Sequence, residues 1–313
     1  MNYKFKAFIQ NTISKLPSKI SYKTYFLIQK KFGNLKNINP YKKLKRGYKI
    51  LEIIKKIEED YKGKRFIEIG TGKAPILPLS LYLHDAKEIT TIDLNPYLSH
   101  YVWDRSISWI SQIRSFLKKE FPLINHEKLD FISEKKVKNN QLKSFLNEIG
   151  IKYLAPCDST NLPFEENYFD FLISSTVLEH IPRKIIKGIM KESKRILSCD
   201  GTLIHGIDYS DHFSHSDKNI SPINFLKFNQ KDFNSLANNR YMYMNRMRDD
   251  DFQELFDNLE FNTIFKEKEI DKELIKLLDI KCKSVALHSD FSKKDKECIA
   301  NLHTWFALKY KKV

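Results

Sequence analysis

Residues 66–80 read FIEIGTGKAPILPLS. A short apolar strand runs into Gly70-Thr71-Gly72, and an apolar helix is expected to follow. Glycines at such a turn let a ligand approach the backbone closely, because they carry no side chain and accept left-handed backbone angles. Dinucleotides, phosphates and adenosyl compounds can all use a loop of this shape. The residues in and around the loop indicate which of these three ligand classes fits.

The loop argues against two of these ligand classes. A dinucleotide-binding loop reads GxGxxG, and here Pro75 stands at the third glycine. The GxxxxGK[ST] pattern of a phosphate-binding loop does not match either. Glu68, two residues before the first glycine, is a poor neighbour for a phosphate and a good one for a cationic ammonium group.

Two aspartates at the ends of later strands indicate which other groups the ligand has. Asp93 ends the second expected strand, and its carboxylate can accept two hydrogen bonds from a ribose diol while repelling a 2′-phosphate. Asp158 follows the third strand and can accept a hydrogen bond from an adenine amino group. A ligand with a ribose, an amino group and no phosphate fits S-adenosylmethionine.

Strands and helices alternate from residue 65 onwards, which predicts an α/β fold with a doubly wound, mostly parallel sheet. Two C-terminal strands, FNTIFKEKE and LHTWFALKYK, are expected to close the sheet as an antiparallel pair. The other expected strands are 65–69, 88–93, 151–156, 169–175 and 201–207, and the expected helices between them are 76–84, about 97–121 and 184–197.

The charge of the chain is concentrated at its N-terminus. The formal net charge is 54 − 39 = +15, and residues 1–65 hold 18 basic and four acidic residues, a net +14. We expect residues 1–62 to form a basic helical extension, with helices near 4–16, 22–32 and 43–61. The spacing of Phe5, Ile9, Ile13 and Leu16 predicts the apolar face of the first helix. Such an extension suits nucleic acid, an anionic membrane or a phosphorylated substrate.

Cysteine usage and hydropathy indicate a cytoplasmic protein. Cys157, Cys199, Cys282 and Cys298 are scattered without a CxxC pair, as in reduced buried thiols. No run of apolar residues approaches a membrane span, and no signal peptide is expected because the N-terminus lacks the apolar segment and cleavage site of one. The basic extension leaves room for peripheral contact with the inner membrane face.

The stretch from about 63 to 207 resembles the class I S-adenosylmethionine-dependent methyltransferases of the type 11 kind. EIGTG resembles their first motif, TTIDLN their ribose-binding acid, and DSTNLPFEENYFDFLISSTVLEHI their later motifs. The resemblance implies a seven-stranded Rossmann-like methyltransferase domain over 63–313, with helical and loop lid insertions at about 98–150 and 208–250. It also implies that the cofactor residues are Glu68, Gly70, Thr71, Gly72, Asp93, Leu94, Asp158, Ser159 and Ser174.

Two segments carry candidate residues for methyl transfer. An aliphatic hydroxyl needs a base, and His180, in Glu179-His180 after the fourth strand, has a suitable pKa range, although this pair can also merely shape the pocket. DYSDHFSHSD (208–217) follows the fifth strand and contributes His212 as a second candidate base, with Asp211 beside it. The expected acceptor contacts are Asp208, Tyr209, His215 and Arg246.

The same acidic and histidine-rich loop offers a metal site. Asp208, Asp211, His212 and His215 could hold a divalent ion such as magnesium, which would acidify a sugar diol. The alternative is a polar turn without a metal. S-adenosylmethionine is the expected cofactor, and a metal is the less expected addition.

The acceptor is inferred on thinner grounds. SYKTYFLIQKKFGNLK (21–36), EIGTGKAP and DYSDHFSH together bear a weaker resemblance to bacterial methyltransferases associated with surface-polysaccharide biosynthesis. The best hypothesis is therefore O-methylation of a sugar, nucleotide-sugar or lipid-linked glycan. A small natural-product methyltransferase and a nucleic-acid methyltransferase that uses the basic N-terminus are the alternatives. The sequence leaves the methylated atom and the oligomeric state open.

Overall fold

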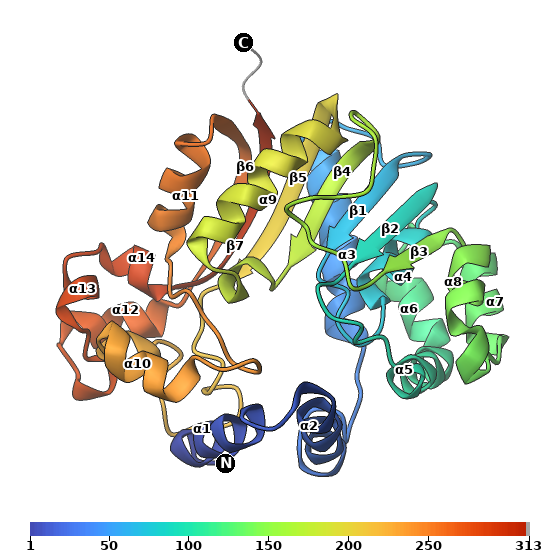
Figure 1. Cartoon of the computed structure of the whole chain (residues 1–313). Coiled ribbons are helices and arrows are strands. Elements are labelled where there is room, and N and C mark those ends of the chain that lie inside the picture. Colours follow the sequence, from blue (N-terminus) through green and yellow to red (C-terminus); the bar gives the residue numbers. More distant parts are fainter. Residues whose placement is uncertain (311–313) are drawn as a thin grey trace.

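A computed structural model describes residues 1–310, and a seven-stranded sheet forms its centre (Figure 1). The strand order is β3-β2-β1-β4-β5-β7-β6. β7 runs antiparallel to β5 and β6, and the remaining neighbours are parallel. The strands are β1 (Arg65–Ile69), β2 (Glu88–Ile92), β3 (Ile151–Leu154), β4 (Phe169–Ser175), β5 (Leu197–Asp208), β6 (Phe261–Ile270) and β7 (Asn301–Tyr310).

All seven strands expected from the sequence are present, and the predicted fold class is confirmed. β5 begins at Leu197, four residues earlier than predicted, because Leu197 already pairs with Phe169 of β4. The last residue of the predicted seventh strand, Lys311, lies outside the described residues.

Helices cover both faces of the sheet (Figure 1). Apolar residues of α3, α4 and the helices between β2 and β3 form one hydrophobic core with β1 and β4, whereas α9 and α11 cover the other face with a second core. The helices are α1 (Tyr3–Ser14), α2 (Ser18–Phe32), α3 (Tyr41–Lys56), α4 (Ile76–Tyr82), α5 (His100–Gln112), α6 (Arg114–Glu120), α7 (His126–Glu134), α8 (Leu142–Glu148), α9 (Arg183–Ile196), α10 (Gln230–Ala237), α11 (Asp249–Asp257), α12 (Lys272–Asp279), α13 (Ser289–Ser292) and α14 (Lys296–Ala300).

Two helix predictions need correction. The helix expected over 97–121 is interrupted at Ile113, whose backbone leaves helical geometry between α5 and α6. α3 ends at Lys56 instead of continuing to residue 61, because Glu58 adopts a positive φ of 59°. In physical terms, a left-handed residue cannot continue a right-handed helix.

The predicted apolar face of α1 is also wrong in part. Tyr3 and Ala7 are buried in a third hydrophobic core beneath α10, and Ile13 is also buried, while Phe5 and Leu16 are exposed. The helix therefore turns a second apolar strip outwards. No helix in residues 1–310 has the length and apolar character needed to cross a membrane.

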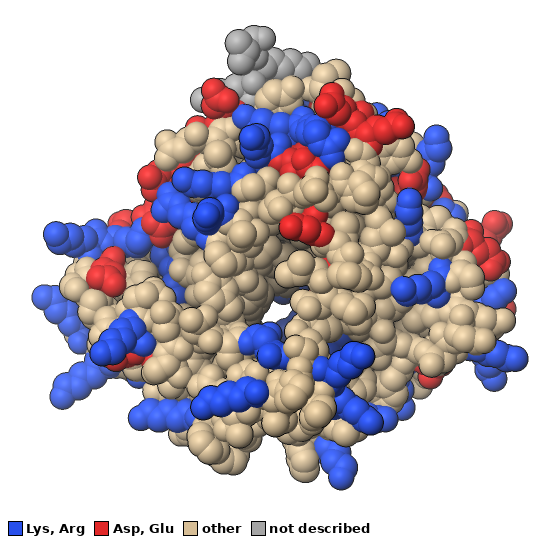
Figure 2. All heavy atoms as spheres, viewed as in Figure 1, with Lys and Arg blue, Asp and Glu red and all other residues tan. Residues whose placement is uncertain are grey.

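The first two helices lie across the carboxyl ends of the parallel strands (Figure 1). α1 packs against α10 on one side, and the loop after β2 meets α2 on the other. Figure 2 shows the molecule hollowed between these helices and the sheet. A cleft at the carboxyl edge of the sheet is therefore closed from below by the N-terminal segment.

The strand order reverses between β1 and β4, and ligands of open α/β sheets bind at such a switch point. The two strand ends approach closely there. Gly70 has a φ of 94°, and a Cβ atom on it would lie 2.4 Å from Cγ2 of Val177, which follows β4. Only glycine fits this position, because both the backbone angle and the space exclude a side chain.

We expect Gly70→Ala to lower the free energy of unfolding by about 1–3 kcal/mol more than Gly63→Ala, since this is the typical cost of overpacking and both variants share the left-handed strain. Gly63 is a matched control, because its φ is 70° and a Cβ there would meet nothing within 4 Å. Urea denaturation of both variants measures the difference. Equal losses of unfolding free energy in the two variants would show that Val177 leaves room for a side chain at position 70.

Candidate active site

Backbone hydrogen bonds hold the carboxyl ends of β1, β2 and β3 side by side. Gly70 N donates to Ile92 O at 2.8 Å, Asp93 N donates to Leu154 O at 3.1 Å, and Cys157 N donates to Asp93 O at 2.9 Å. The three predicted stations for the cofactor, at Gly70, Asp93 and Asp158, are thus placed along one edge of the sheet.

Asp93 lies directly under the glycine loop. Its Oδ2 accepts a hydrogen bond from Gly72 N at 2.9 Å, and its Oδ1 accepts one from Asn95 N at 2.9 Å. Burial raises the pKa of this carboxyl, although the two N–H groups oppose the shift. Each carboxylate oxygen keeps a second lone pair, so the side chain can still accept hydrogen bonds from a diol.

Glu68 is buried below the loop, with only 4 % of its surface exposed. The Thr91 hydroxyl donates to Glu68, and the hydroxyls of Thr71 and Thr91 lie 2.5 Å apart. Burial raises the pKa of Glu68 to about 7. An ammonium group brought beside this carboxyl would favour its charged form.

Lys43 is a site residue that sequence reasoning missed. It comes from α3, and its Nζ lies 3.6 Å from the position that a Cβ on Gly72 would take. Desolvation of its ammonium group lowers the pKa of Lys43, while the nearby carboxylates of Glu68 and Asp93 oppose the shift. The apolar positions Leu44, Ile50 and Ile54 of α3 could have revealed that this helix packs on the core and does not merely decorate the surface.

The remaining cofactor candidates differ in exposure. Asp158 is exposed, and its Oδ1 accepts hydrogen bonds from the N–H and hydroxyl of Thr160. Leu94 is exposed beside Asp93, and Ser159 is half-buried. Ser174 is fully buried and bonded to Nδ1 of His205 at 2.8 Å, so its hydroxyl is used inside the sheet.

The segment after β4 presents Glu179 and His180 at the cleft. Asn245 holds this turn, because its Nδ2 donates to Leu178 O at 2.8 Å and to Ile181 O at 2.9 Å. Nδ1 of His180 donates to Tyr243 O at 2.7 Å, since a carbonyl can only accept, and this leaves Nε2 with a free lone pair in the neutral ring. Burial, followed by the nearby His212, lowers the pKa of His180 to about 4.

Glu179 is buried, and neither of its carboxylate oxygens has a hydrogen-bond partner within the described chain. Burial raises its pKa well above the ordinary value. Arg46 of α3, a second residue that sequence reasoning missed, donates to the Thr176 hydroxyl at 3.1 Å and partly offsets this shift.

The loop after β5 brings two further imidazoles to the same place. Burial opposes ionisation of Asp208, but the His212 ring 3.4 Å away and hydrogen bonds from Ser210 keep the pKa of Asp208 below its usual range. The ring of His212 lies 4.7 Å from that of His180 and 4.9 Å from that of His215. Nε2 of His215 lies 3.0 Å from the Ser210 hydroxyl.

Three other candidates are engaged inside the protein. Tyr209 is buried against Phe252. Asp211 accepts hydrogen bonds from Phe213 N at 2.8 Å and Asn224 Nδ2 at 3.2 Å. Arg246 donates to Phe228 O at 2.7 Å and to other groups of the insertion. These contacts order the insertion at 208–250.

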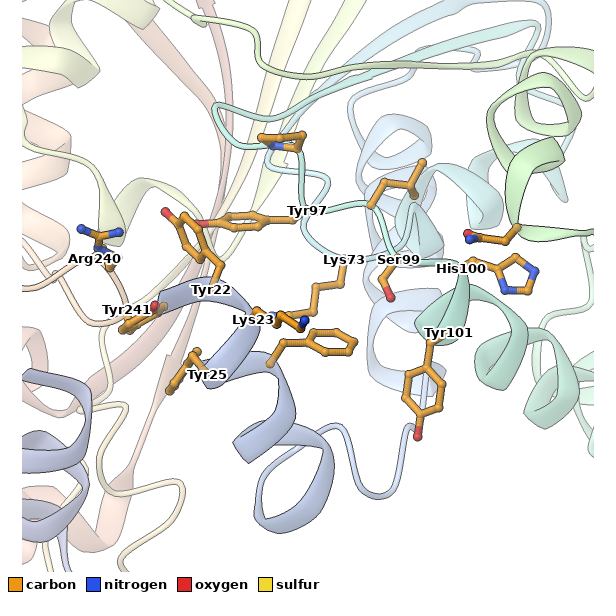
Figure 3. Close-up of a pocket in the computed structure, with 14 residues that line it drawn as sticks. Tyr22, Lys23, Tyr25, Lys73, Tyr97, Ser99, His100, Tyr101, Arg240 and Tyr241 are labelled. Atoms are coloured by element: carbon orange, nitrogen blue, oxygen red, sulfur yellow. The ribbon is translucent and has the colours of Figure 1, made fainter. Parts of the chain in front are cut away.

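A cavity of about 790 Å³ opens between α2 and the loop after β2 (Figure 3). Tyr22, Tyr97 and Tyr241 meet there edge to face, with ring centroids 5.3 and 5.9 Å apart. Lys73, from the glycine loop, points towards α2. The lining consists of Tyr22, Lys23, Tyr25, Phe26, Lys73, Pro96, Tyr97, Leu98, Ser99, His100, Tyr101, Asn139, Arg240 and Tyr241.

Residues 124–205, less than half of the chain, match a family described as "Methyltransferase domain". The matched stretch includes β3, β4 and the Glu179-His180 turn.

The chain carries a methyltransferase domain.

This match confirms the predicted methyltransferase class, and with it S-adenosylmethionine as the cofactor of that class. The roles of individual residues of the methyltransferase remain predictions.

The chain also aligns with solved structures at low identity. The chain aligns with the PH0226 protein of Pyrococcus horikoshii OT3 at 14% identity and a TM-score of 0.44, covering 84% of this chain and 90% of that one. Geranyl diphosphate C-methyltransferase of Streptomyces coelicolor A3(2) aligns at 7% identity and a TM-score of 0.46, covering 84% and 78%. Phosphoethanolamine N-methyltransferase 2 of Haemonchus contortus aligns at 15% and 0.43, covering 84% and 52%. No curated protein sequence matches the chain.

We expect Glu68→Gln to change how the stability of the methyltransferase depends on pH. The native carboxyl holds its proton up to about pH 7, whereas the unfolded one releases it near 4.5. Wild type binds more protons when folded, so rising pH across this window should cost it about 3 kcal/mol of unfolding free energy relative to the variant.

Urea denaturation at pH 4.5, 6 and 8 measures this difference, with the exposed Glu166→Gln as control. Parallel pH profiles for wild type and Glu68→Gln would contradict a raised pKa at Glu68.

Proposed function

We propose that the protein transfers the methyl group of S-adenosylmethionine to a hydroxyl of a sugar that carries a phosphate or diphosphate, as in a nucleotide-sugar or a lipid-linked glycan. The main support for this class of acceptor is the cavity beside the glycine loop. Its charged lining residues, Lys23, Lys73 and Arg240, are all cationic.

The glycine loop and its neighbours fit the cofactor. Gly70 and Gly72 expose backbone where a side chain would block approach, and Glu68 offers a buried carboxylate to an ammonium group. Asp93 suits the ribose diol and Asp158 the adenine amino group, as inferred from the sequence. We add Lys43 as the partner of the methionine carboxylate, since its ammonium group stands beside Gly72.

The cavity offers unpaired cations and aromatic rings to the acceptor. None of Lys23, Lys73 and Arg240 forms an ion pair with a carboxylate in residues 1–310; Arg240 instead lies 5.7 Å from the Tyr22 ring. Guanidinium and ammonium groups in such a setting bind phosphate oxygens through charge-assisted hydrogen bonds. The tyrosine rings supply flat apolar surface with hydroxyl donors for the sugar.

Glu179, His180 and His212 lie at the ends of β4 and β5, next to the switch point where the methyl group would be presented. When bound, S-adenosylmethionine supplies an electrophilic methyl carbon. The acceptor oxygen forms a bond to that carbon as its bond to sulfur breaks, and the hydroxyl proton has to leave. We assign removal of this proton to the cluster of Glu179, His180 and His212.

The outer surface of α1 and α2 favours a lipid-linked acceptor. Residues 1–51 contain no acidic residue, and Figure 2 shows Lys and Arg side chains along this rim of the molecule. Large apolar side chains are exposed between them, with Phe8 at 66 % and Phe32 at 81 %. Apolar residues interleaved with lysines are typical of helices that lie on anionic membranes.

Inorganic pyrophosphate is the probe for the acceptor site. We expect it to bind the protein in calorimetry, and we expect Lys23→Gln or Arg240→Gln to weaken binding about 10- to 100-fold, since hydrogen bonds to charged groups contribute about 1.5–3 kcal/mol. Lys191→Gln is the control, because Lys191 is exposed on α9 away from the cavity. Equal affinity in all variants would contradict an anion site in this cavity.

Vesicle binding distinguishes a lipid-linked acceptor from a soluble nucleotide-sugar. Sedimentation with anionic but not neutral vesicles, reduced by Phe8→Ser, is expected for a lipid-linked acceptor. Pyrophosphate binding without any vesicle binding would exclude the membrane and leave a soluble nucleotide-sugar.

A further inference from the structure

Glu179, His180 and His212 form a group of three metal-ligand side chains within residues 1–310. Each offers one ligand atom, and the three atoms lie within 4.8 Å of one another. His180 and Glu179 come from the turn after β4, and His212 comes from the loop after β5. The two loops meet because β4 and β5 are parallel neighbours, so their carboxyl ends share one edge.

The acceptor atoms of this group have no hydrogen-bond donor facing them. Both oxygens of Glu179 are buried without a partner, and Nε2 of His180 presents a lone pair because Nδ1–H already donates to Tyr243 O. A buried carboxylate without a partner is costly, and it is normally paired or bound to a metal. A cation between the three side chains would satisfy all of these acceptors at once.

We propose that Glu179, His180 and His212 bind one divalent transition-metal ion of the zinc or manganese kind. Two imidazoles and one carboxylate are ligands that such ions accept, and they leave coordination positions open for oxygen atoms of another molecule. Metal–ligand distances of about 2.0–2.2 Å require the ligand atoms to approach by roughly an ångström from their present limit.

The surroundings orient the ligands. Asp208 lies 3.4 Å from Nε2 of His212, and a carboxylate behind a metal-binding imidazole fixes the ring and strengthens it as a ligand. The charged and titratable groups near the three side chains are Asp208, Tyr209, His215 and Arg46. This set differs from the one expected from the sequence, since Asp211 is bound by Phe213 and Asn224 and only His212 is common to both.

A hydroxyl bound to this ion would be acidified, so the ion and its three ligands would together bring about the proton removal assigned to this cluster above. Metal binding itself does not depend on the acceptor or the cofactor. Full-length protein is dialysed against EDTA and titrated with Zn²⁺ by calorimetry, and Co²⁺ absorption reports coordination by the same site. We expect one ion per chain, with binding weakened by more than about 100-fold in His212→Ala, His180→Ala and Glu179→Gln, because loss of a ligand exceeds the 10- to 100-fold effect of losing an outer partner.

Asp211→Asn and the exposed His126→Ala are the controls and should bind as wild type does. His212→Ala keeps the test decisive if the buried Glu179 variant unfolds, because His212 is partly exposed. Absence of binding to wild type, retention of tight binding in His212→Ala, or an equal loss in Asp211→Asn would each overturn the proposal.

Discussion

The close approach of the ends of β1 and β4 sets the position of every functional candidate. The chain leaves β1 towards β2 and β3, and it returns to β4 on the other side, so the two connections part at this point. Gly70 permits the approach because a side chain there would collide with Val177. The glycine loop, Asp93 and Asp158 then lie along one half of the sheet edge, and the turn bearing Glu179 and His180 faces them from the other half.

Charge that is poorly compensated gathers around this edge. Glu68 and Glu179 are buried with raised pKa values, and desolvation of its ammonium group lowers the pKa of Lys43. Burial of charged groups opposes folding unless partners offset it, so these residues are better explained by binding than by stability. In the complexes that we propose, an ammonium and a carboxylate on the cofactor would complement Glu68 and Lys43, and a metal ion would complement Glu179.

Much of the fold was predictable, because strands buried on both faces stand out as apolar runs and Gly70-Thr71-Gly72 marks a strand-to-helix turn. Asp93 was predictable from its place at a strand end. Lys43 and Arg46 were not predicted as site residues. A helix rich in lysine and arginine resembles an exposed surface helix unless its apolar side is recognised as packing on α4. Phe5 on α1 was wrongly predicted to be buried for a similar reason. Helical periodicity identifies an apolar face, but it does not show which face packs against the rest of the protein. The pairing of His180 with His212 depends on the contact between two loops that are distant in sequence.

We propose that the sheet edge between β1 and β4 binds S-adenosylmethionine through Asp93 and Lys43. Calorimetric titration with S-adenosylhomocysteine, which keeps the ribose, the adenine and the amino-acid end, tests it most directly. We expect micromolar binding by wild type, abolished by Asp93→Ala and weakened at least about tenfold by Lys43→Met, since a charge-assisted contact is worth about 1.5–3 kcal/mol. NAD and ATP should bind neither wild type nor variants. Absence of S-adenosylhomocysteine binding, a preference for NAD, or full affinity in Asp93→Ala would contradict the account.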